Sequence, residues 1–292
     1  MTLVEIYRSR LRPPCDERAF VLHAVGIGSE VAWTGEAWSL LVALEAQAAA
    51  VAQLRHYERE NPRSRARLAD EPLHAHAWTG SAGYVAVLLA VAYLAGRKTF
   101  GVDWLDAGAV QSAAIRAGDA WRAATAVTLH WDIGHLLANL GFGAVFGLFA
   151  GQLLGPGLAW ATALAAAVLA NTLNAWIQPA SHVSAGASTL VFAMLGLLSA
   201  YAWRRRSSRR ERWAYRWAPL IAGVALLAFT GSAGERTDVL AHLTGFGCGA
   251  AAGLALGSTR AATAGRRAQV LAGLGALALL AVAWSVALTA GH

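Results

Sequence analysis

Residue types that can perform acyl transfer recur in three apolar stretches of this chain. Ser188 stands at the head of an apolar run, STLVFAMLGLL, and His242 stands near the start of a later one. His130, His135 and Asn139 mark a third. Serine becomes a nucleophile when a base takes its proton, and histidine is the usual base. These residues therefore indicate hydrolysis of an acyl bond, provided that the fold brings the three stretches together.

The same stretches offer donors for the oxyanion that forms during acyl transfer. His135 and Asn139 are four residues apart and hence lie on one face of a helix. The backbone N–H of Ser188 lies at a predicted helix start, where it has no intrahelical partner. A lone serine in an apolar helix is usually structural, so the chemical interpretation depends on the histidines reaching the same depth.

Composition predicts that these stretches lie in a membrane. The chain has 292 residues, of which 57% are hydrophobic and 14% are charged, too apolar for an ordinary soluble domain. The net charge is +7, but the arginines cluster at the ends of apolar runs, which is a topology signal and not one of nucleic-acid binding. The two cysteines, Cys15 and Cys248, lie in unlike surroundings, so no disulfide framework, metal site or cofactor is indicated.

Seven apolar stretches are candidate membrane spans, and several are shorter than roughly 20 residues, as expected for helices buried within a bundle or in a locally thinned bilayer. They are residues 81–95, 133–150, 158–177, 184–202, 217–231, 239–256 and 270–288. The tryptophans and scattered charges of residues 96–129 predict a segment at the membrane interface. Arginines cluster at 63–67, 204–212 and 260–267, all on one side of a chain that crosses seven times. By the positive-inside rule, we expect a multi-pass protein of the cell (inner) membrane with a cytoplasmic N-terminus and an external C-terminus.

This topology brings the polar groups of the second, fourth and sixth spans to one depth near the outer surface. Four glycines recur at every fourth residue of the sixth span: Gly245, Gly249, Gly253 and Gly257. Such a bare face lets another membrane helix approach closely. Because His242 begins this face, close contact with the fourth span would bring it to Ser188, with Phe192 packed on its ring. The glycines alone fit a tightly packed transporter bundle equally well.

Taken together, the motifs resemble those of rhomboid intramembrane serine proteases, in that family's order. They are His130-x4-His135-x3-Asn139, Gly186-Ala187-Ser188 and Ala241-His242-x2-Gly245-x3-Gly249, preceded by Trp121-Arg122. The resemblance implies a catalytic dyad of Ser188 and His242, without a carboxylate. It also implies an oxyanion hole of His135, Asn139 and the Ser188 N–H, which His130 would support.

The resemblance further implies an all-α membrane fold, with a six-helix core over residues 79–256 and one additional helix, residues 267–289. It implies an endopeptidase that acts on transmembrane protein substrates in the lipid bilayer without a cofactor. One residue departs from the pattern, because the family commonly has glycine after the serine and this chain has Thr189. Threonine is bulkier and can bond locally, which would alter the rate; we expect the chemistry to persist.

Residues 1–70 have the composition of a small soluble α/β module, which the topology places in the cytoplasm. The continuous apolar run of residues 19–27, AFVLHAVGI, predicts a strand. Alternating residues around Val31 and Trp33, and again at 38–42, predict two further strands. Residues 43–61 predict a helix that ends before Pro62.

Two other functions remain open on the sequence. A non-catalytic member of the same fold would bind transmembrane helices, but it would normally lack Ser188 or His242. A transporter that uses histidines as a proton relay would pair them with acidic groups inside the membrane. The acidic residues near the spans, Asp132, Glu235 and Asp238, lie at span ends, and the two halves of the chain show no evident repeat.

Overall fold

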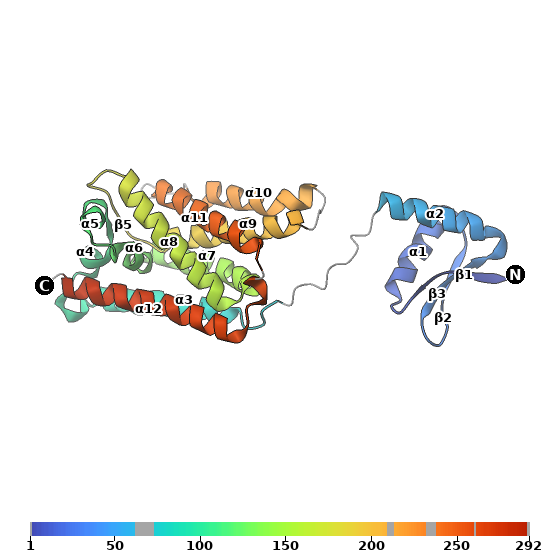
Figure 1. The fold of residues 1–292 in the computed structure, drawn as a ribbon, viewed down its shortest axis with the longest axis horizontal. Coiled ribbons are helices and arrows are strands. Elements are labelled where there is room, and N and C mark those ends of the chain that lie inside the picture. The colour runs from blue at the N-terminus through green and yellow to red at the C-terminus, as the bar shows by residue number, and fades with distance from the viewer. Residues whose placement is uncertain (1, 62–72, 209–212, 232–237, 260, 291–292) are drawn as a thin grey trace. The chain divides into compact units, whose positions relative to one another are not determined.

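A computed structural model describes residues 2–61, 73–208, 213–231, 238–259 and 261–290. The chain divides into two compact units, Met1–Ala69 and Asp70–His292, coloured along the chain in Figure 1. Several charged residues used for the topology lie outside the described residues: the arginines at 63–67, Arg209, Arg210, Arg212, Glu235 and Arg260.

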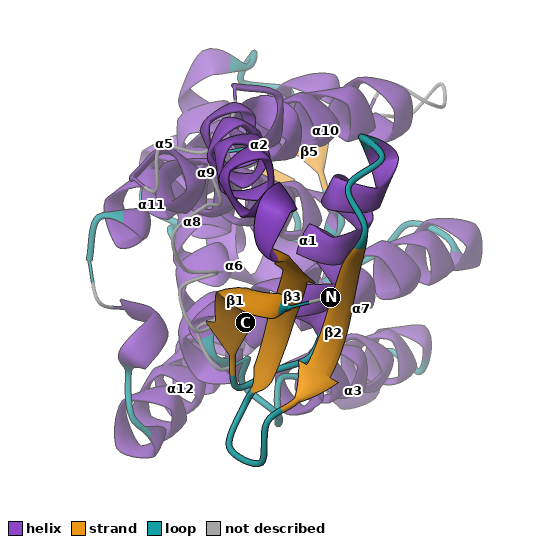
Figure 2. Ribbon diagram, turned by 90° about the vertical axis from the view of Figure 1, so that its right-hand side faces the viewer, coloured by secondary structure: helices purple, strands orange, loops and turns teal. Residues whose placement is uncertain are grey.

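The first unit is a three-stranded antiparallel sheet with two helices. Its elements are β1 (Leu3–Ser9), α1 (Pro13–Ala24), β2 (Ser29–Trp33), β3 (Trp38–Ala43), a 3-10 turn (Leu44–Ala46) and α2 (Gln47–Glu60). β3 is the central strand (Figure 2). Its alternate residues Leu40 and Val42 are fully buried, in one cluster with Leu22 of α1 and Leu54 of α2. This alternation predicted β2 and β3, whereas β1 was not predicted.

The strand predicted for residues 19–27 is wrong. Most of these residues lie in α1, which begins with two prolines, and proline in the first turn of a helix sacrifices no intrahelical hydrogen bond. α1 buries Cys15, Arg18, Ala19 and Leu22. This spacing has the period of a helix, which the continuous apolar run concealed.

The second unit contains seven long helices within its described residues. They are α3 (Trp78–Gly96), α7 (Ile133–Leu154), α8 (Pro156–Ile177), α9 (Ser188–Ser208), α10 (Trp213–Gly231), α11 (Val239–Gly257) and α12 (Arg266–Ala290). Each overlaps one predicted span. Five of them, α3, α7, α8, α11 and α12, are long and apolar enough to cross a membrane. α9 ends in Arg205 and Arg206, and the apolar part of α10 is shorter, so crossings by these two helices stay predictions.

The stretch between α3 and α7 folds into short elements. They are a 3-10 turn (Thr99–Gly101), α4 (Trp104–Gly108), β4 (Val110–Gln111), α5 (Ser112–Ala117), α6 (Arg122–Thr125) and a second 3-10 turn (Ala126–Thr128). β4 pairs with β5 (Val183–Ser184), just ahead of α9. In Figure 1, α4, α5 and α6 lie together at the end of the bundle where α12 finishes. β4 therefore lies beside the segment that precedes Ser188.

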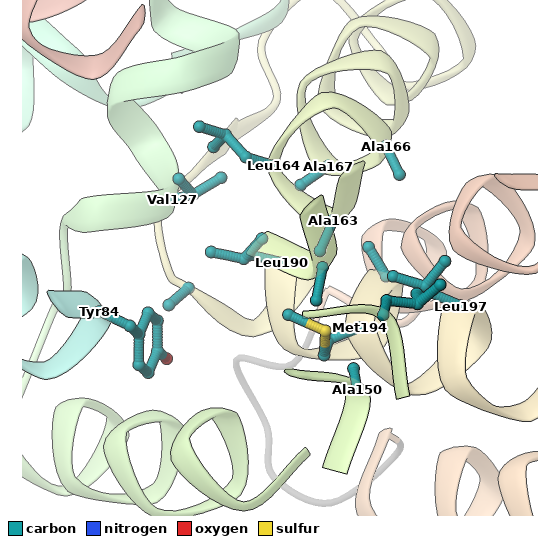
Figure 3. Close-up of a cluster of buried hydrophobic side chains, with 14 of the residues drawn as sticks. Tyr84, Val127, Ala150, Ala163, Leu164, Ala166, Ala167, Leu190, Met194 and Leu197 are labelled. Carbon is teal, nitrogen blue, oxygen red and sulfur yellow. The ribbon is translucent and has the colours of Figure 1, made fainter. Parts of the chain in front are cut away.

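The core of the bundle lies where α7, α8 and α9 meet. Met194 and Leu197 of α9 are buried in one cluster with Ala163 and Ala167 of α8 (Figure 3). Lipid tails are as apolar as these side chains, so membrane helices associate through close packing and hydrogen bonds, and small residues permit that packing. The alanines of α8 thus give α9, which begins with Ser188, a close-fitting support.

Candidate active site

A cavity of about 920 Å³ lies among α7, α9, α11 and the loop before α9. Its lining includes His135 and Asn139 from α7, Ser188 from α9 and His242 from α11. The structure therefore brings to one cavity the four side chains that the sequence predicted as nucleophile, base and oxyanion donors. His130 does not line this cavity; it borders a smaller one, of about 340 Å³, beside α3.

Ser188 is the first residue of α9. The first turn of a helix presents N–H groups without intrahelical partners and the positive end of the helix dipole. A β-carbon at Gly186 would lie 2.5 Å from Cε1 of His135 and 3.5 Å from Oγ of Ser188. A side chain at position 186 would therefore fill the space between the imidazole and the hydroxyl. Glycine keeps this space open for a reacting group.

His242 lies in the first turn of α11 and is buried. The helix is capped by Asp238, whose carboxylate accepts a hydrogen bond from the Ala241 N–H at 3.0 Å. The His242 ring packs on Phe192, with 4.3 Å between ring centroids. Phe192 is four residues after Ser188 and hence on the same face of α9. The packing places the imidazole beside the first turn of α9.

The glycine face of α11 lies against α9. A β-carbon at Gly245 would lie 2.6 Å from the carbonyl oxygen of Thr189. A β-carbon at Gly249 would overlap the carbonyl oxygen of Ala193, and one at Gly253 would overlap that of Leu197. No side chain fits between these backbones. The position of His242 relative to Ser188 is therefore set by direct contact of two helix backbones, and Thr189, the unusual residue, lies in that contact.

His130 supports the residue before the serine. It lies in the loop ahead of α7, and its Nε2 accepts a hydrogen bond from the Ala187 N–H at 3.3 Å. Its ring meets that of His135 edge to face at 5.2 Å. Burial, with a smaller contribution from the charge of His135, lowers the pKa of His130 to about 4. The imidazole is accordingly neutral near pH 7, as an accepting Nε2 requires.

Asn139 is held on two sides. Its Nδ2 donates to the His135 carbonyl one turn earlier at 2.9 Å, which uses one of the two amide hydrogens. Its backbone carbonyl oxygen accepts a hydrogen bond from the hydroxyl of Tyr84 on α3 at 2.9 Å. Sequence reasoning missed Tyr84. The available signal in the sequence was a tyrosine within an apolar span. In the structure Gly143 of α7 makes room for it, since a β-carbon there would lie 2.5 Å from the Tyr84 hydroxyl oxygen.

A polar cluster centred on Asp238 lies at the rim of the cavity and was also missed. The Asp238 carboxylate is 2.9 Å from Nε2 of His182 and accepts from Nδ2 of Asn174 at 3.1 Å. Nε2 of Gln178 lies 3.5 Å from the same carboxylate. These contacts tie the end of α8 and the following loop to the start of α11. The signal in the sequence was an aspartate directly before an apolar run, which is typical of a helix N-cap.

The Trp121-Arg122 pair organises the short elements ahead of α7. Arg122 donates from Nη1 to the carbonyl of Asp106 at 2.6 Å, and from Nε to the carboxylate of Asp119 at 3.1 Å. Trp121 donates from Nε1 to the carbonyl of Ala107 at 3.3 Å. The pair thus satisfies carbonyls of α4 and does not line the cavity. Within the described residues, no group of three or more His, Cys, Asp or Glu is arranged to hold a metal ion.

Comparison with known proteins identifies the domain in which these site residues lie. Residues 117–259 match the rhomboid domain. A stretch of 144 residues is 31% identical to Rhomboid-like protease 2 of Toxoplasma gondii, covering 48% of this chain and 49% of that protein. The chain thus spans about half the length of the curated relative that it matches.

The protein is a multi-pass membrane protein that contains a rhomboid domain at residues 117–259. This match confirms the resemblance that the motifs predicted. Ser188, His242, His135 and Asn139 all lie within the matched residues. The first unit, α3 and α12 lie outside them.

Proposed function

We propose that this protein is an intramembrane serine endopeptidase that hydrolyses peptide bonds in or near the transmembrane segments of membrane-anchored proteins. The observation that carries the proposal is the single cavity to which Ser188, His242 and His135 come from the starts of three helices. Many members of the rhomboid family are serine proteases, and the T. gondii relative is itself named a protease.

In the proposed reaction, Oγ of Ser188 attacks the carbonyl carbon of the scissile peptide bond. His242 takes the hydroxyl proton as the C–O bond forms. The tetrahedral intermediate then breaks its C–N bond, and His242 returns the proton to the leaving amine. A water molecule, deprotonated by the same imidazole, then attacks the acyl carbon. The C–Oγ bond breaks, the imidazole returns the proton to Oγ of Ser188, and the new carboxyl terminus is released. No cofactor or metal takes part.

The oxyanion of the intermediate needs preorganised donors. The N–H of Ser188, the imidazole of His135 and the remaining amide hydrogen of Asn139 are the candidates, since the two side chains line the cavity and the N–H begins α9. Loss of one such donor costs about 100- to 1,000-fold in rate. His130 acts behind them by holding the Ala187 N–H.

Helix packing orients the His242 imidazole. Its ring is held by Phe192, and α11 is held against α9 by the glycine face. This arrangement places the imidazole to act as the base that accepts the Ser188 proton.

The proposal is tested with purified protein and a transmembrane substrate in proteoliposomes. Ser188→Ala should abolish cleavage and remain folded. Ser184→Ala is the matched control, because Ser184 also lines the cavity but precedes the helix start, and it should retain activity. Cleavage by Ser188→Ala at the wild-type rate would contradict the proposal, and a helix-binding role without catalysis would then account for the fold.

We further propose that the N-terminus is cytoplasmic and the C-terminus external. Arginines at the end of α9 and the start of α12 support this orientation. Cysteines introduced at 204–206 should be protected from an impermeant thiol reagent in intact cells, whereas those at 178–182 should react. Labelling in the reverse pattern would overturn the orientation.

A further inference from the structure

We infer that α12, which lies outside the rhomboid match, positions the oxyanion side of the site through Trp284. Trp284 lies near the end of α12 and is 8% exposed. Its indole Nε1 donates to the hydroxyl oxygen of Thr128 at 3.0 Å, and Thr128 is two residues before His130. The catalytic consequence of this inference rests on the proposed function, whereas the structural contact does not.

Thr128 links Trp284 to the backbone that holds the loop before the serine. Its hydroxyl accepts from Trp284 and donates to the carbonyl of Thr125 at 2.7 Å. In the same 3-10 turn, the carbonyl of Ala126 accepts from the Gly186 N–H at 3.0 Å. The turn anchored by Trp284 therefore binds the backbone two residues ahead of Ser188.

A second, apolar link runs from Trp284 to the same two segments. Leu129 and Ala185 are buried in one cluster with the indole, and the ring of Trp104 lies 4.5 Å from it between centroids. Leu129 precedes His130, and Ala185 precedes Gly186. A β-carbon at Gly108 would lie 2.6 Å from the indole ring, so α4 leaves room only for this arrangement. Trp284 thus shares a buried cluster with one residue from each segment that carries the oxyanion support.

The other end of α12 is tied down without any connection to the site. Gln269 donates from Nε2 to the carbonyl of Leu154 at 2.8 Å and accepts from the Leu158 N–H at 2.9 Å. These bonds attach the start of α12 to the junction between α7 and α8. Gln269 and Trp284 are fifteen positions apart in the helix, which is ~22 Å at 1.5 Å per residue. Gln269 therefore supplies a control that weakens α12 at a distance from the chemistry.

Trp284 acts through other residues, so it is a positioning residue. Catalytic donors must be held within about 0.5 Å of their productive geometry by the groups behind them. Loosening the turn that holds Gly186, and with it the nearby His130 that holds Ala187, should therefore lower kcat. It should leave KM for a transmembrane substrate unchanged, because Trp284 does not line the cavity.

The test compares conservative variants at both partners. Trp284→Phe keeps an aromatic ring but removes the donor, and Thr128→Val removes the hydroxyl at nearly constant shape. Each should lower kcat about tenfold, the order of one lost hydrogen bond, with KM within about twofold. The double variant should be no slower than either single one. Thr128→Ser keeps the hydroxyl and should therefore have the wild-type kcat. Gln269→Leu should lower the melting temperature and leave kcat unchanged.

A readout independent of activity separates this inference from the proposed function. In protein with labelled histidines, Trp284→Phe and Thr128→Val should shift the imidazole resonances of His130, and Gln269→Leu should not. An unchanged His130 resonance, or an equal shift in the Gln269 variant, overturns the inference. If wild-type cleavage depends on Ser188, an unchanged kcat in Trp284→Phe also overturns the inference. If cleavage does not depend on Ser188, the proposed function fails and the resonances alone decide the role of Trp284.

Discussion

α11 and α12 are both apolar helices that carry glycines, but they contact the bundle in different ways. On α11, Gly245, Gly249 and Gly253 each face a backbone carbonyl of α9 so closely that no β-carbon fits. On α12, Gly275 has no atom within 4 Å of a β-carbon, and at Gly273 the nearest atom is 3.7 Å away. Among the described glycine contacts, α12 meets a backbone closely only where Gly157 of α8 faces Gln269, far from the site, and near the site it is held by the hydrogen bond of Trp284.

The difference separates two ways of positioning a catalytic group. Contact between backbones leaves no rotatable side chain between the helices, so α11 holds His242 directly beside the first turn of α9. α12 acts on the site through the hydrogen bond between the Trp284 indole and the Thr128 hydroxyl. Its effect on kcat should therefore be no larger than the loss of one hydrogen bond. Changes on α11 should therefore affect both folding and chemistry, whereas those on α12 should have smaller effects.

The largest effect should come from the two dyad residues. Ser188→Ala and His242→Ala should each abolish cleavage in single-turnover assays while the melting temperature stays near that of wild type. The double variant should be hardly slower than either, because residues that act as one chemical unit are strongly non-additive. Independent, multiplicative losses would show that the two residues do not work together across the α9–α11 contact.

Next should be the glycine contact itself. Gly249→Leu should lower both thermal stability and turnover, because its side chain would push α11 away from Ala193. Overpacking of this kind costs about 1–3 kcal/mol. Two matched variants carry the same change into open space, Gly247→Leu on α11 and Gly275→Leu on α12. Both should stay within about 0.5 kcal/mol of wild type. Equal losses in all three variants would remove the distinction between the two helices.

Asn139 should have an intermediate effect that separates direct from indirect positioning. Asn139→Ala should lower kcat about 100- to 1,000-fold if its free amide hydrogen faces the oxyanion. Tyr84→Phe removes the hydroxyl that holds the Asn139 carbonyl and should cost about tenfold or less. Steady-state kinetics of both variants test this order. If Tyr84→Phe were slower than Asn139→Ala, the hydroxyl from α3 would contribute more to kcat than the side-chain amide of Asn139.

The effect that is smallest at neutral pH is a dependence of stability on pH at His130. The folded state lowers the pKa of this imidazole from 6.5 to about 4, so the unfolded chain binds a proton that the folded chain rejects. Stability should therefore be complete above pH 6.5 and decline as the pH falls towards 4. Melting temperatures measured across this range should fall less steeply for His130→Gln. Parallel curves would mean that His130 does not contribute to the acid sensitivity.

Local sequence was sufficient for the features that depend on composition and period. The apolar stretches predicted the long helices, since membrane spans are encoded by length and hydropathy. The four-residue period of the glycines predicted a bare face, and Ser188 and His242 were singled out as polar groups in apolar surroundings. α1 was mistaken for a strand because an apolar run of nine residues fits either structure when its period is ignored.

Contacts between distant segments were not predictable in the same way. The bond between Trp284 and Thr128 joins residues 156 positions apart, and Asp238 meets Asn174 and His182 across separate elements. Each of these polar groups looks ordinary in its own segment. Their partners are decided by how helices stack, which neither the glycine period nor the hydropathy of a single helix specifies.

The most direct measurement of the central claim is labelling of the detergent-solubilised protein with a serine-directed phosphonate, followed by mass spectrometry of the modified peptide. The account predicts modification at Ser188, loss of labelling in Ser188→Ala, severe loss in His242→Ala and normal labelling in Ser184→Ala. Wild-type labelling in the Ser188→Ala protein, or modification of a different serine, would contradict it.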